Sequence, residues 1–278
     1  MPLPVVLNGG GVRPIRSGGV VMSARKPTGY VVYDGPSMID HERIVVVVLT
    51  GDSRNQKTGK MVQTYILRAD MSPLDASKSG ADISICGTCP HRGKPTKDPT
   101  KKQAAGRSCY VTLGHGPMNV WRGLVNGIYP HRTGILDMVG MGSGRKVRLG
   151  TYGDPAAVPS YVWTALLTEA TGHTGYSHQS GVRGADFRPD MVMASADTLA
   201  QAEAFWSDDV RTFRVVNDVT DVVAGREILC PASKEAGKRT QCETCGLCAG
   251  SSVKAKSIAI VAHGIGAGNF AQNVQQTA

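Results

Sequence analysis

The feature that most restricts the fold of this chain is the distribution of its cysteines. The sequence has seven, an odd number, and they form two groups with none outside them. A disulfide framework normally spreads an even number of cysteines along a short chain. Grouped thiols in a reducing compartment are instead typical of metal sites, so the pattern predicts one or two metal centres. The groups are Cys86, Cys89 and Cys109, and Cys230, Cys242, Cys245 and Cys248.

The second group has a spacing that favours an iron-sulfur cluster. Cys242, Cys245 and Cys248 form a Cys-x2-Cys-x2-Cys run, and the more distant Cys230 is followed by Pro231. Four thiolates bind either zinc or a cluster, but a zinc ribbon generally uses two separate Cys-x2-Cys pairs. The present arrangement is closer to that of bacterial ferredoxins. We therefore expect a [4Fe-4S] cluster here, with Zn as the alternative.

The first group offers only three sulfurs. Cys86 and Cys89 form a Cys-x2-Cys pair, and nineteen residues separate Cys89 from Cys109. Three thiolates on a four-iron cluster would keep one iron open for chemistry, whereas an added His91 or His115 would complete a structural zinc site. The sequence leaves both alternatives open.

Positive charge is concentrated between the cysteines of the first group. The chain has a formal net charge of +9, and the loop 92–107 has only Asp98 to oppose its basic residues. Such a loop can bind nucleic-acid phosphates or offset the charge of a thiolate cluster. We predict that it is exposed and contacts a polyanion, with nucleic acid as the partner. Its basic residues are Arg92, Lys94, Lys97, Lys101, Lys102 and Arg107.

Residues 1–28 are rich in Gly, Pro and Arg and lack hydrophobic periodicity, so they are predicted to be a flexible arm. Residues 29–278 are predicted to form a single α/β metal-binding domain. No segment resembles a signal peptide, and no apolar run approaches the ~20 residues that a membrane-spanning helix needs. We therefore expect a cytoplasmic protein that does not enter a membrane.

Two patterns predict the fold. The β-branched runs 43–49 and 62–67 are separated by a polar, glycine-containing segment, which indicates a hairpin. From Val147 onward, short apolar strands alternate with helical segments, as in βαβ units with a parallel sheet. We therefore expect a partial or complete β/α barrel with an N-terminal β-hairpin region and cysteine-rich metal-binding insertions.

In such barrels, functional side chains lie at the C-terminal ends of the strands. Asp154, His178, Asp197 and Cys230 each follow a predicted strand, so we expect them at one end of the barrel. Asp197 is also predicted to cap the helix that follows it.

Several segments resemble a family of uncharacterised phage and prophage proteins and, more loosely, the phage gene-product-eighty-eight family. The resemblance runs from about Tyr33 to Gly264 and implies a phage origin, a shared architecture and the host cytoplasm as location. The matching segments are 55–59, 84–93, Cys109-Tyr110, 149–155, 174–179 and 230–248.

The cysteine groups also resemble, more distantly, those of radical S-adenosylmethionine enzymes. That resemblance implies that Cys86, Cys89 and Cys109 hold the reactive cluster and that the second group holds an auxiliary cluster. It further implies that Gly153 and Asp154 meet the amino group of S-adenosylmethionine. The usual Cys-x3-Cys-x2-Cys spacing is replaced here by Cys-x2-Cys and the remote Cys109.

The expected function is that of a radical-SAM-like iron-sulfur enzyme acting on a nucleic acid, a nucleotide or another macromolecule, with Asp154 as the catalytic residue that orients the cofactor. One alternative is a zinc-binding, nucleic-acid-binding protein without catalysis. Another is a zinc-bearing barrel enzyme that exchanges bases, with Asp154 or Asp197 as its acidic nucleophile. Metal identity separates the first from the other two.

Overall fold

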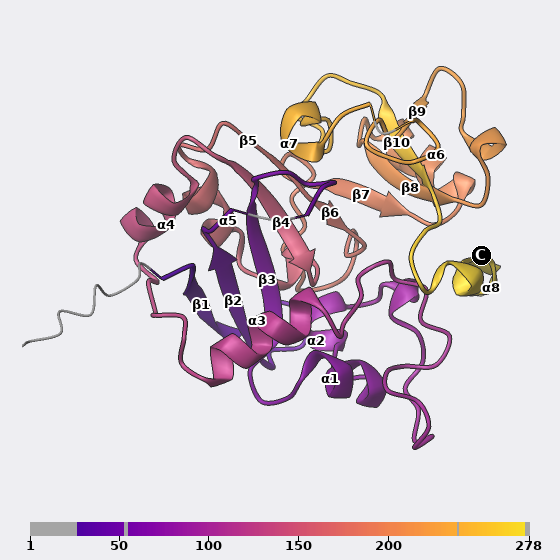
Figure 1. Cartoon of the computed structure of the whole chain (residues 1–278). Helices are drawn as coiled ribbons and strands as arrows, with labels where there is room; N and C mark the ends of the chain where they lie inside the picture. Colours follow the sequence, from indigo (N-terminus) through magenta and orange to yellow (C-terminus); the bar gives the residue numbers. More distant parts are fainter. Residues whose placement is uncertain (1–26, 53–54, 238, 276–278) are drawn as a thin grey trace, which may run out of the picture.

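The computed structural model describes residues 27–52, 55–237 and 239–275, and the predicted arm 1–28 lies almost entirely outside them. Figure 1 shows two sheets side by side, with helices around their outer sides. The fold is therefore a mixed α/β architecture, as predicted. Among the described strands the pairings form two five-stranded sheets that are rich in parallel pairs.

The first sheet changes from antiparallel to parallel pairing across its width. β1 and β3 both pair antiparallel with β2, while β4 pairs parallel with both β3 and β5. The predicted hairpin is confirmed as β2 and β3, whose β-branched side chains are buried over most of their length. The strands are β1 Gly29–Pro36, β2 Arg43–Leu49, β3 Val62–Arg68, β4 Lys146–Tyr152 and β5 Gly172–Thr174.

The second sheet is parallel throughout, with the strand order β6-β7-β8-β10-β9. A single residue, Gly175, separates β6 from β5 of the first sheet. The carbonyl of Gly175 accepts a hydrogen bond from the Met193 N–H, and its own N–H donates to the Cys248 carbonyl. The strands are β6 Tyr176–Ser177, β7 Met193–Ala196, β8 Thr212–Val216, β9 Glu227–Leu229 and β10 Ser257–Val261.

The helices surround the sheets. α4 packs on α5, which contacts β4, while α1, α2 and α3 cover the lower side of the first sheet in Figure 1. No described helix is both long enough and apolar enough to cross a membrane. The helices are α1 Pro73–Ser79, α2 Ile83–Cys86, α3 Gly116–Val125, α4 Ile135–Gly142, α5 Ser160–Leu167, α6 Leu199–Ser207, α7 Cys242–Cys245 and α8 Phe270–Gln275.

The predicted cap of α6 is wrong by one residue. Thr198, not Asp197, is the N-cap: its hydroxyl accepts from the Gln201 N–H, and the Gln201 side chain accepts from the Thr198 N–H. This reciprocal capping box satisfies the free N–H groups of the first turn. The carboxylate of Asp197 is therefore available to contact other side chains.

Two apolar clusters form the core. The larger one lies around the first sheet and includes Ile44, Leu67 and Trp163. The smaller one lies at the second sheet, where Met193 and Ile258 pack with three cysteines of the second group. The second cysteine group is thus part of the core that covers this sheet.

Candidate active site

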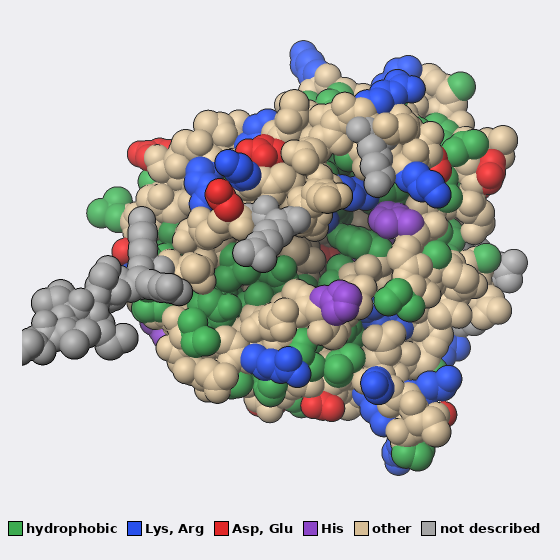
Figure 2. Space-filling model, viewed as in Figure 1, with side chains coloured by type: hydrophobic (Ala, Val, Ile, Leu, Met, Phe, Trp, Pro, Cys, Tyr) green, Lys and Arg blue, Asp and Glu red, His purple; other side chains and the backbone are tan. Residues whose placement is uncertain are grey.

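One cavity of about 440 Å³ lies between the two sheets, and all seven cysteines line it. A hollow with hydrophobic side chains at its floor is visible on the face shown in Figure 2. Most of the strand residues that line the cavity alternate along each strand, in keeping with the two-residue period of a β-strand. Among them are Arg148, Gly150 and Tyr152 of β4, Thr174 and Tyr176 of β5 and β6, Phe213 and Val215 of β8, and Ile258 and Ile260 of β10.

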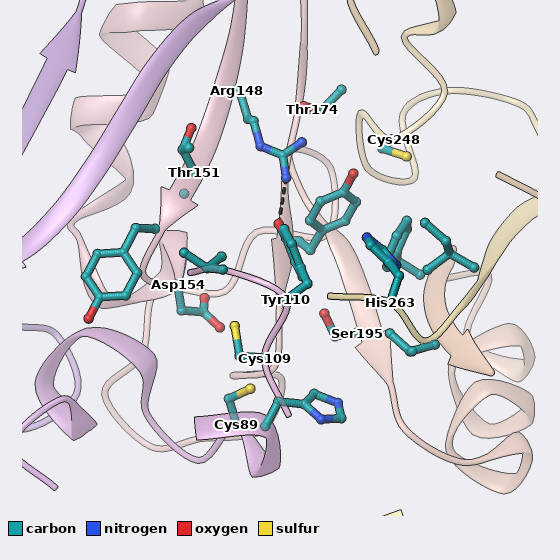
Figure 3. Close-up of a pocket in the computed structure, with 18 of the residues that line it drawn as sticks. Cys89, Cys109, Tyr110, Arg148, Thr151, Asp154, Thr174, Ser195, Cys248 and His263 are labelled. Carbon is teal, nitrogen blue, oxygen red and sulfur yellow. Dashed lines mark hydrogen bonds between the residues drawn. The ribbon is translucent and has the colours of Figure 1, made fainter. Parts of the chain in front are cut away.

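The four residues predicted to lie at strand ends all line this cavity. Asp154 follows β4, His178 follows β6, Asp197 follows β7 and Cys230 follows β9. Figure 3 shows Cys89 and Cys109 on one side of the cavity and Cys248 on the other. The two cysteine groups therefore face a common space.

A short helix and a turn position the first two cysteines. Cys86 is the last residue of α2, and Cys89 precedes a single helical turn that begins at Pro90. The Cys89 N–H donates to the Cys86 carbonyl at 3.2 Å. Between them Gly87 has a φ of 53°, a conformation that favours glycine.

Backbone pairing explains how the remote Cys109 joins this group. Lys94 and Ala105 exchange two backbone hydrogen bonds, both of 2.9 Å, which close the base of the intervening loop. The Cys109 N–H then donates to the His91 carbonyl at 3.0 Å. The nineteen-residue gap is therefore a projecting loop, and it does not separate the cysteines in space.

Gln179 holds this turn in place, although sequence reasoning assigned it no role. Its side chain is fully buried, and its Oε1 accepts from the Thr88 N–H at 3.1 Å. Its Nε2 donates to the Cys86 carbonyl at 3.1 Å and to Asp154 Oδ2 at 3.2 Å. Gln179 therefore fixes the loop of the first cysteine group to the end of β6.

Changing Gln179 to Leu is expected to lower the free energy of unfolding by about 1 to 3 kcal/mol, because the partly buried Cys86 carbonyl and Thr88 N–H would lose their partner. Metal bound at the first group should fall more than metal bound at the second. Chemical denaturation and metal analysis measure the two effects. Gln103→Leu, on the projecting loop, is the control, and equal losses in the two variants would argue against this role.

Burial favours the protonated thiols of Cys86 and Cys109 in the metal-free protein. It raises the pKa of Cys86 well above its usual value, and the neighbouring Asp82, Cys89 and Cys109 raise that pKa further. Burial also raises the pKa of Cys109, an effect that Arg107 opposes. A metal that binds these sulfurs as thiolates must therefore displace protons.

Gly153 allows close packing of the protein on itself. Its φ is 85°, and a Cβ there would lie 2.7 Å from the Ile66 Cβ and 3.2 Å from the Ile85 carbonyl oxygen. The next residue, Asp154, donates its N–H to the same carbonyl at 2.6 Å. The glycine thus brings the end of β4 against α2, which carries Cys86.

Asp154 is buried, and protein groups bind both of its carboxylate oxygens. Oδ1 accepts from the Ala156 N–H at 3.0 Å, and Oδ2 accepts from the His178 N–H at 2.8 Å. Burial raises the pKa of Asp154, although these bonds oppose the rise. The carboxylate therefore positions the cavity wall, and its predicted role toward a cofactor stays a prediction.

His91, His178 and Asp197 form a buried network beside the first group. Asp197 Oδ1 lies 2.8 Å from His91 Nε2 and 3.2 Å from His178 Nε2, and His91 Nδ1 lies 2.8 Å from Ser108 Oγ. Burial alone would raise the pKa of Asp197, but its hydrogen bonds with His178 and His91 lower it below the usual value. Both ring nitrogens of His91 are therefore engaged.

The histidine that contacts a cysteine of the first group is His178. Burial opposes its protonation, but the interactions with Cys89 and Asp197 raise its pKa well above the usual value. His115 lies exposed at the start of α3 and also lines the cavity. The sequence suggested His91 or His115 as a fourth ligand of the first group. Both ring nitrogens of His91 contact Ser108 or Asp197 instead. Of the three histidines, His178 is therefore the best placed to join Cys89.

The second group is assembled from a strand end and a one-turn helix. Cys230 extends β9, and its N–H donates to the Ala259 carbonyl at 2.8 Å. Cys242 and Cys245 are the ends of α7, and Gly246, with a φ of 65°, ends that helix. Burial raises the pKa of Cys248 to about 12, although a hydrogen bond from Tyr176 opposes the rise.

The connection between β2 and β3 fastens α7 to the first sheet. The Cys242 N–H donates to the Lys57 carbonyl, and the Lys60 N–H donates to the Glu243 carboxylate, both at 2.8 Å. Gly59 has a φ of 66°, and a Cβ there would collide with Glu243. The segment 55–59, noted in the sequence, therefore contributes to the second cysteine group.

One compact set of metal-binding side chains lies beside the first cysteine group. Among the described residues, the only three metal-binding side chains whose donor atoms all lie within 4.8 Å of one another are His91, His178 and Asp197. No three sulfurs of either cysteine group meet that limit. The cysteines of the second group are nevertheless near one another, since, besides burial, Cys242 and Cys245 raise the pKa of the Cys230 thiol.

No family model, curated protein or solved structure matches this chain. The function is therefore inferred from the geometry and chemistry of the site itself.

Proposed function

We propose that the chain is an iron-sulfur enzyme with two four-iron clusters facing one substrate cavity. The observation that carries this proposal is that all seven cysteines, from both ends of the domain, line the same cavity. Three sulfurs at the first group would leave one iron open, while four at the second would complete an auxiliary cluster.

The lack of three sulfurs within 4.8 Å of one another among the described residues fits clusters better than single zinc ions. Tetrahedral zinc with Zn–S bonds of ~2.3 Å brings its sulfurs to about 3.8 Å from one another. A four-iron cluster holds its thiolates farther apart, because each sulfur binds a different iron. The absence of any compact sulfur triplet among the described residues is in line with the wider arrangement.

The arrangement of the strands supports a barrel-type active site. We propose that the two sheets, joined through Gly175, act as one open β/α barrel with the cavity at its strand ends. In barrels of this kind, reactive groups gather where parallel strands end. The placement of Asp154, His178 and Asp197 follows that rule.

A radical-SAM-like reaction is the chemistry that this arrangement favours. Cys86, Cys89 and Cys109 would hold the open-iron cluster. Once reduced by an external one-electron donor, such a cluster would supply reductive cleavage of the sulfur–C5′ bond of S-adenosylmethionine, with methionine as one product and, after a hydrogen atom is taken from the substrate, 5′-deoxyadenosine as the other. Beside the first group, the buried Tyr152 hydroxyl has no hydrogen-bond partner among the described residues. A bound polar group would satisfy it, because buried hydroxyls are rarely left unpaired.

The proposal is tested with protein reconstituted and reduced without oxygen. Incubation with S-adenosylmethionine should release 5′-deoxyadenosine and methionine in equal amounts, measured by chromatography. Fully loaded, reduced protein that neither binds nor cleaves S-adenosylmethionine would reject this chemistry.

The projecting loop supports a polyanionic partner. Lys94, Lys97, Lys101 and Lys102 are exposed, as predicted, and Lys and Arg side chains gather on the projection at the lower right of Figure 2. Arg92 and Arg107 do not share this exposure. Arg92 pairs with Asp82, and the buried Arg107 donates to the Cys109 and Val111 carbonyls. We propose that the four lysines contact nucleic-acid phosphates.

Replacing these four lysines with Ala is expected to weaken binding to duplex DNA and to flatten its salt dependence. Each phosphate contact contributes about 0.9 to the slope of log affinity against log salt, so the slope should fall by about 3 to 4. Fluorescence anisotropy over a salt series measures it. The exposed Lys234, Lys254 and Lys256, changed together, serve as the control. No binding by the unmodified protein at low salt would end this proposal.

A further inference from the structure

The centre of the cavity contains a buried guanidinium without an acidic partner. Arg148 is 7% exposed, its Nη2 donates to the Tyr110 hydroxyl at 2.7 Å, and it lies 5.5 Å from the centre of the Tyr176 ring. Among the described residues no Asp or Glu forms an ion pair with it. An unpaired buried charge is costly, so such a group normally has an anion nearby.

Strand register places a second unsatisfied group beside Arg148. Thr174 of β5 is the direct partner of Arg148 of β4, so the two side chains are on the same face of the sheet. Thr174 is 2% exposed, and its hydroxyl has no hydrogen-bond partner among the described residues. Figure 3 shows Thr174 close to the Arg148 guanidinium and on the side toward Cys248.

The donors at this point outnumber the acceptors. Arg148 has five N–H groups in a planar fork that suits carboxylate or phosphate oxygens. The Tyr110 hydroxyl accepts from Arg148, which leaves its own proton to donate. The Thr174 hydroxyl can donate to the same acceptor.

We propose that Arg148, Tyr110 and Thr174 bind the anionic head of the substrate, a carboxylate or a phosphate ester. This inference rests on the proposed function only in taking the cavity as the active site. It deepens that proposal by naming the substrate class.

The apolar part of the cavity lining indicates the rest of the substrate. Phe213 and Val215 of β8 and Ile258 and Ile260 of β10 line the same cavity with apolar side chains. A group that lies against them must itself be largely apolar. The substrate class is therefore an anionic head joined to an apolar or flat body.

Another task for Arg148 would be to offset the charge of the second cysteine group. Burial opposes its charge, but Tyr110, Tyr176 and Cys242 raise its pKa above the usual value, so the guanidinium does interact with that group. That task requires no free donors and does not involve Thr174. The two roles therefore predict different responses to an added anion.

The test titrates the full chain, reconstituted without oxygen, with inorganic phosphate and separately with acetate by calorimetry at low salt. We expect at least one of these anions to bind. Arg148→Met should weaken the affinity for that anion by about tenfold or more, and Thr174→Val should weaken it by about three- to tenfold. Arg145→Met, which removes the same charge outside the cavity, should bind like the unmodified protein. Tight phosphate binding would indicate a phosphate ester, and preferential acetate binding a carboxylate.

Arg148→Lys keeps a charge at this position and serves if Arg148→Met does not fold. It should bind the anion more weakly than the unmodified protein because it lacks the fork. No binding of either anion, or unchanged binding by the Arg148 variants, would overturn the inference. Metal and sulfide analysis of the same samples separates the two proposals. A protein that contains zinc but binds phosphate through Arg148 would support this anion site and contradict the iron-sulfur clusters.

Discussion

Changing Cys109 to Ala is expected to abolish cleavage of S-adenosylmethionine, with a fall in rate of at least about 100-fold, since disturbing even the groups around a metal's ligands costs 10- to 100-fold. The structure brings Cys109 beside Cys86 and Cys89 through its bond to the His91 carbonyl. Two remaining sulfurs would not retain a four-iron cluster. The measurement is 5′-deoxyadenosine release by reduced protein.

The second group provides the internal control for this variant. Its four cysteines come from the residue after β9, from α7 and from the following loop, away from the bonds that position Cys109. Iron and sulfide should therefore fall to about half, and the absorption of the remaining cluster should persist. Undiminished cleavage by Cys109→Ala would show that the first group does not hold the reactive cluster.

Changing Cys245 to Ala is expected to destabilise the metal-loaded protein by roughly 3 to 6 kcal/mol, a fraction of the ~10 to 16 kcal/mol that a four-ligand metal site contributes to folding. Cys245 is only half-buried, so the loss of packing is small. Most of the expected loss in the free energy of unfolding would come from the metal, because the second group joins the end of β9, α7 and the segment between β2 and β3. Denaturant unfolding under anaerobic conditions gives the free energy.

The same substitution in metal-free protein is the matched control. There it should change the free energy of unfolding by less than about 1 kcal/mol, as for other partly exposed positions. Similar losses with and without metal would mean that Cys245 is a packing residue and not a ligand.

The predictions from sequence succeeded where the signal was local. The runs at 43–49 and 62–67 have the composition of strands and do form β2 and β3. The alternation after Val147 likewise yields the parallel strands, and the residues expected at their ends meet in one cavity.

Long-range pairing determined what the sequence did not reveal. The approach of Cys109 to Cys86 depends on the Lys94–Ala105 pairing, and the role of Gln179 depends on its contact with a turn ninety-three residues away. The neighbourhood of Arg148 and Thr174 follows from the register of two parallel strands. Residue spacing along a chain does not determine register between distant strands.

Gly153 and Asp154 show a different limit. Their turn was correctly expected at a strand end, but its composition alone could not reveal which group each residue approaches. Gly153 packs closely on Ile66, and Asp154 binds backbone N–H groups. A Gly-Asp-Pro turn has the same sequence whether it approaches a ligand or another part of the protein.

The central claim is that the seven cysteines bind iron-sulfur clusters at one cavity. The most direct test is the iron, acid-labile sulfide and zinc content of protein purified without oxygen, together with its absorption spectrum. Two four-iron clusters predict brown protein with about eight iron and eight sulfide per chain and little zinc. Stoichiometric zinc without sulfide would contradict the claim.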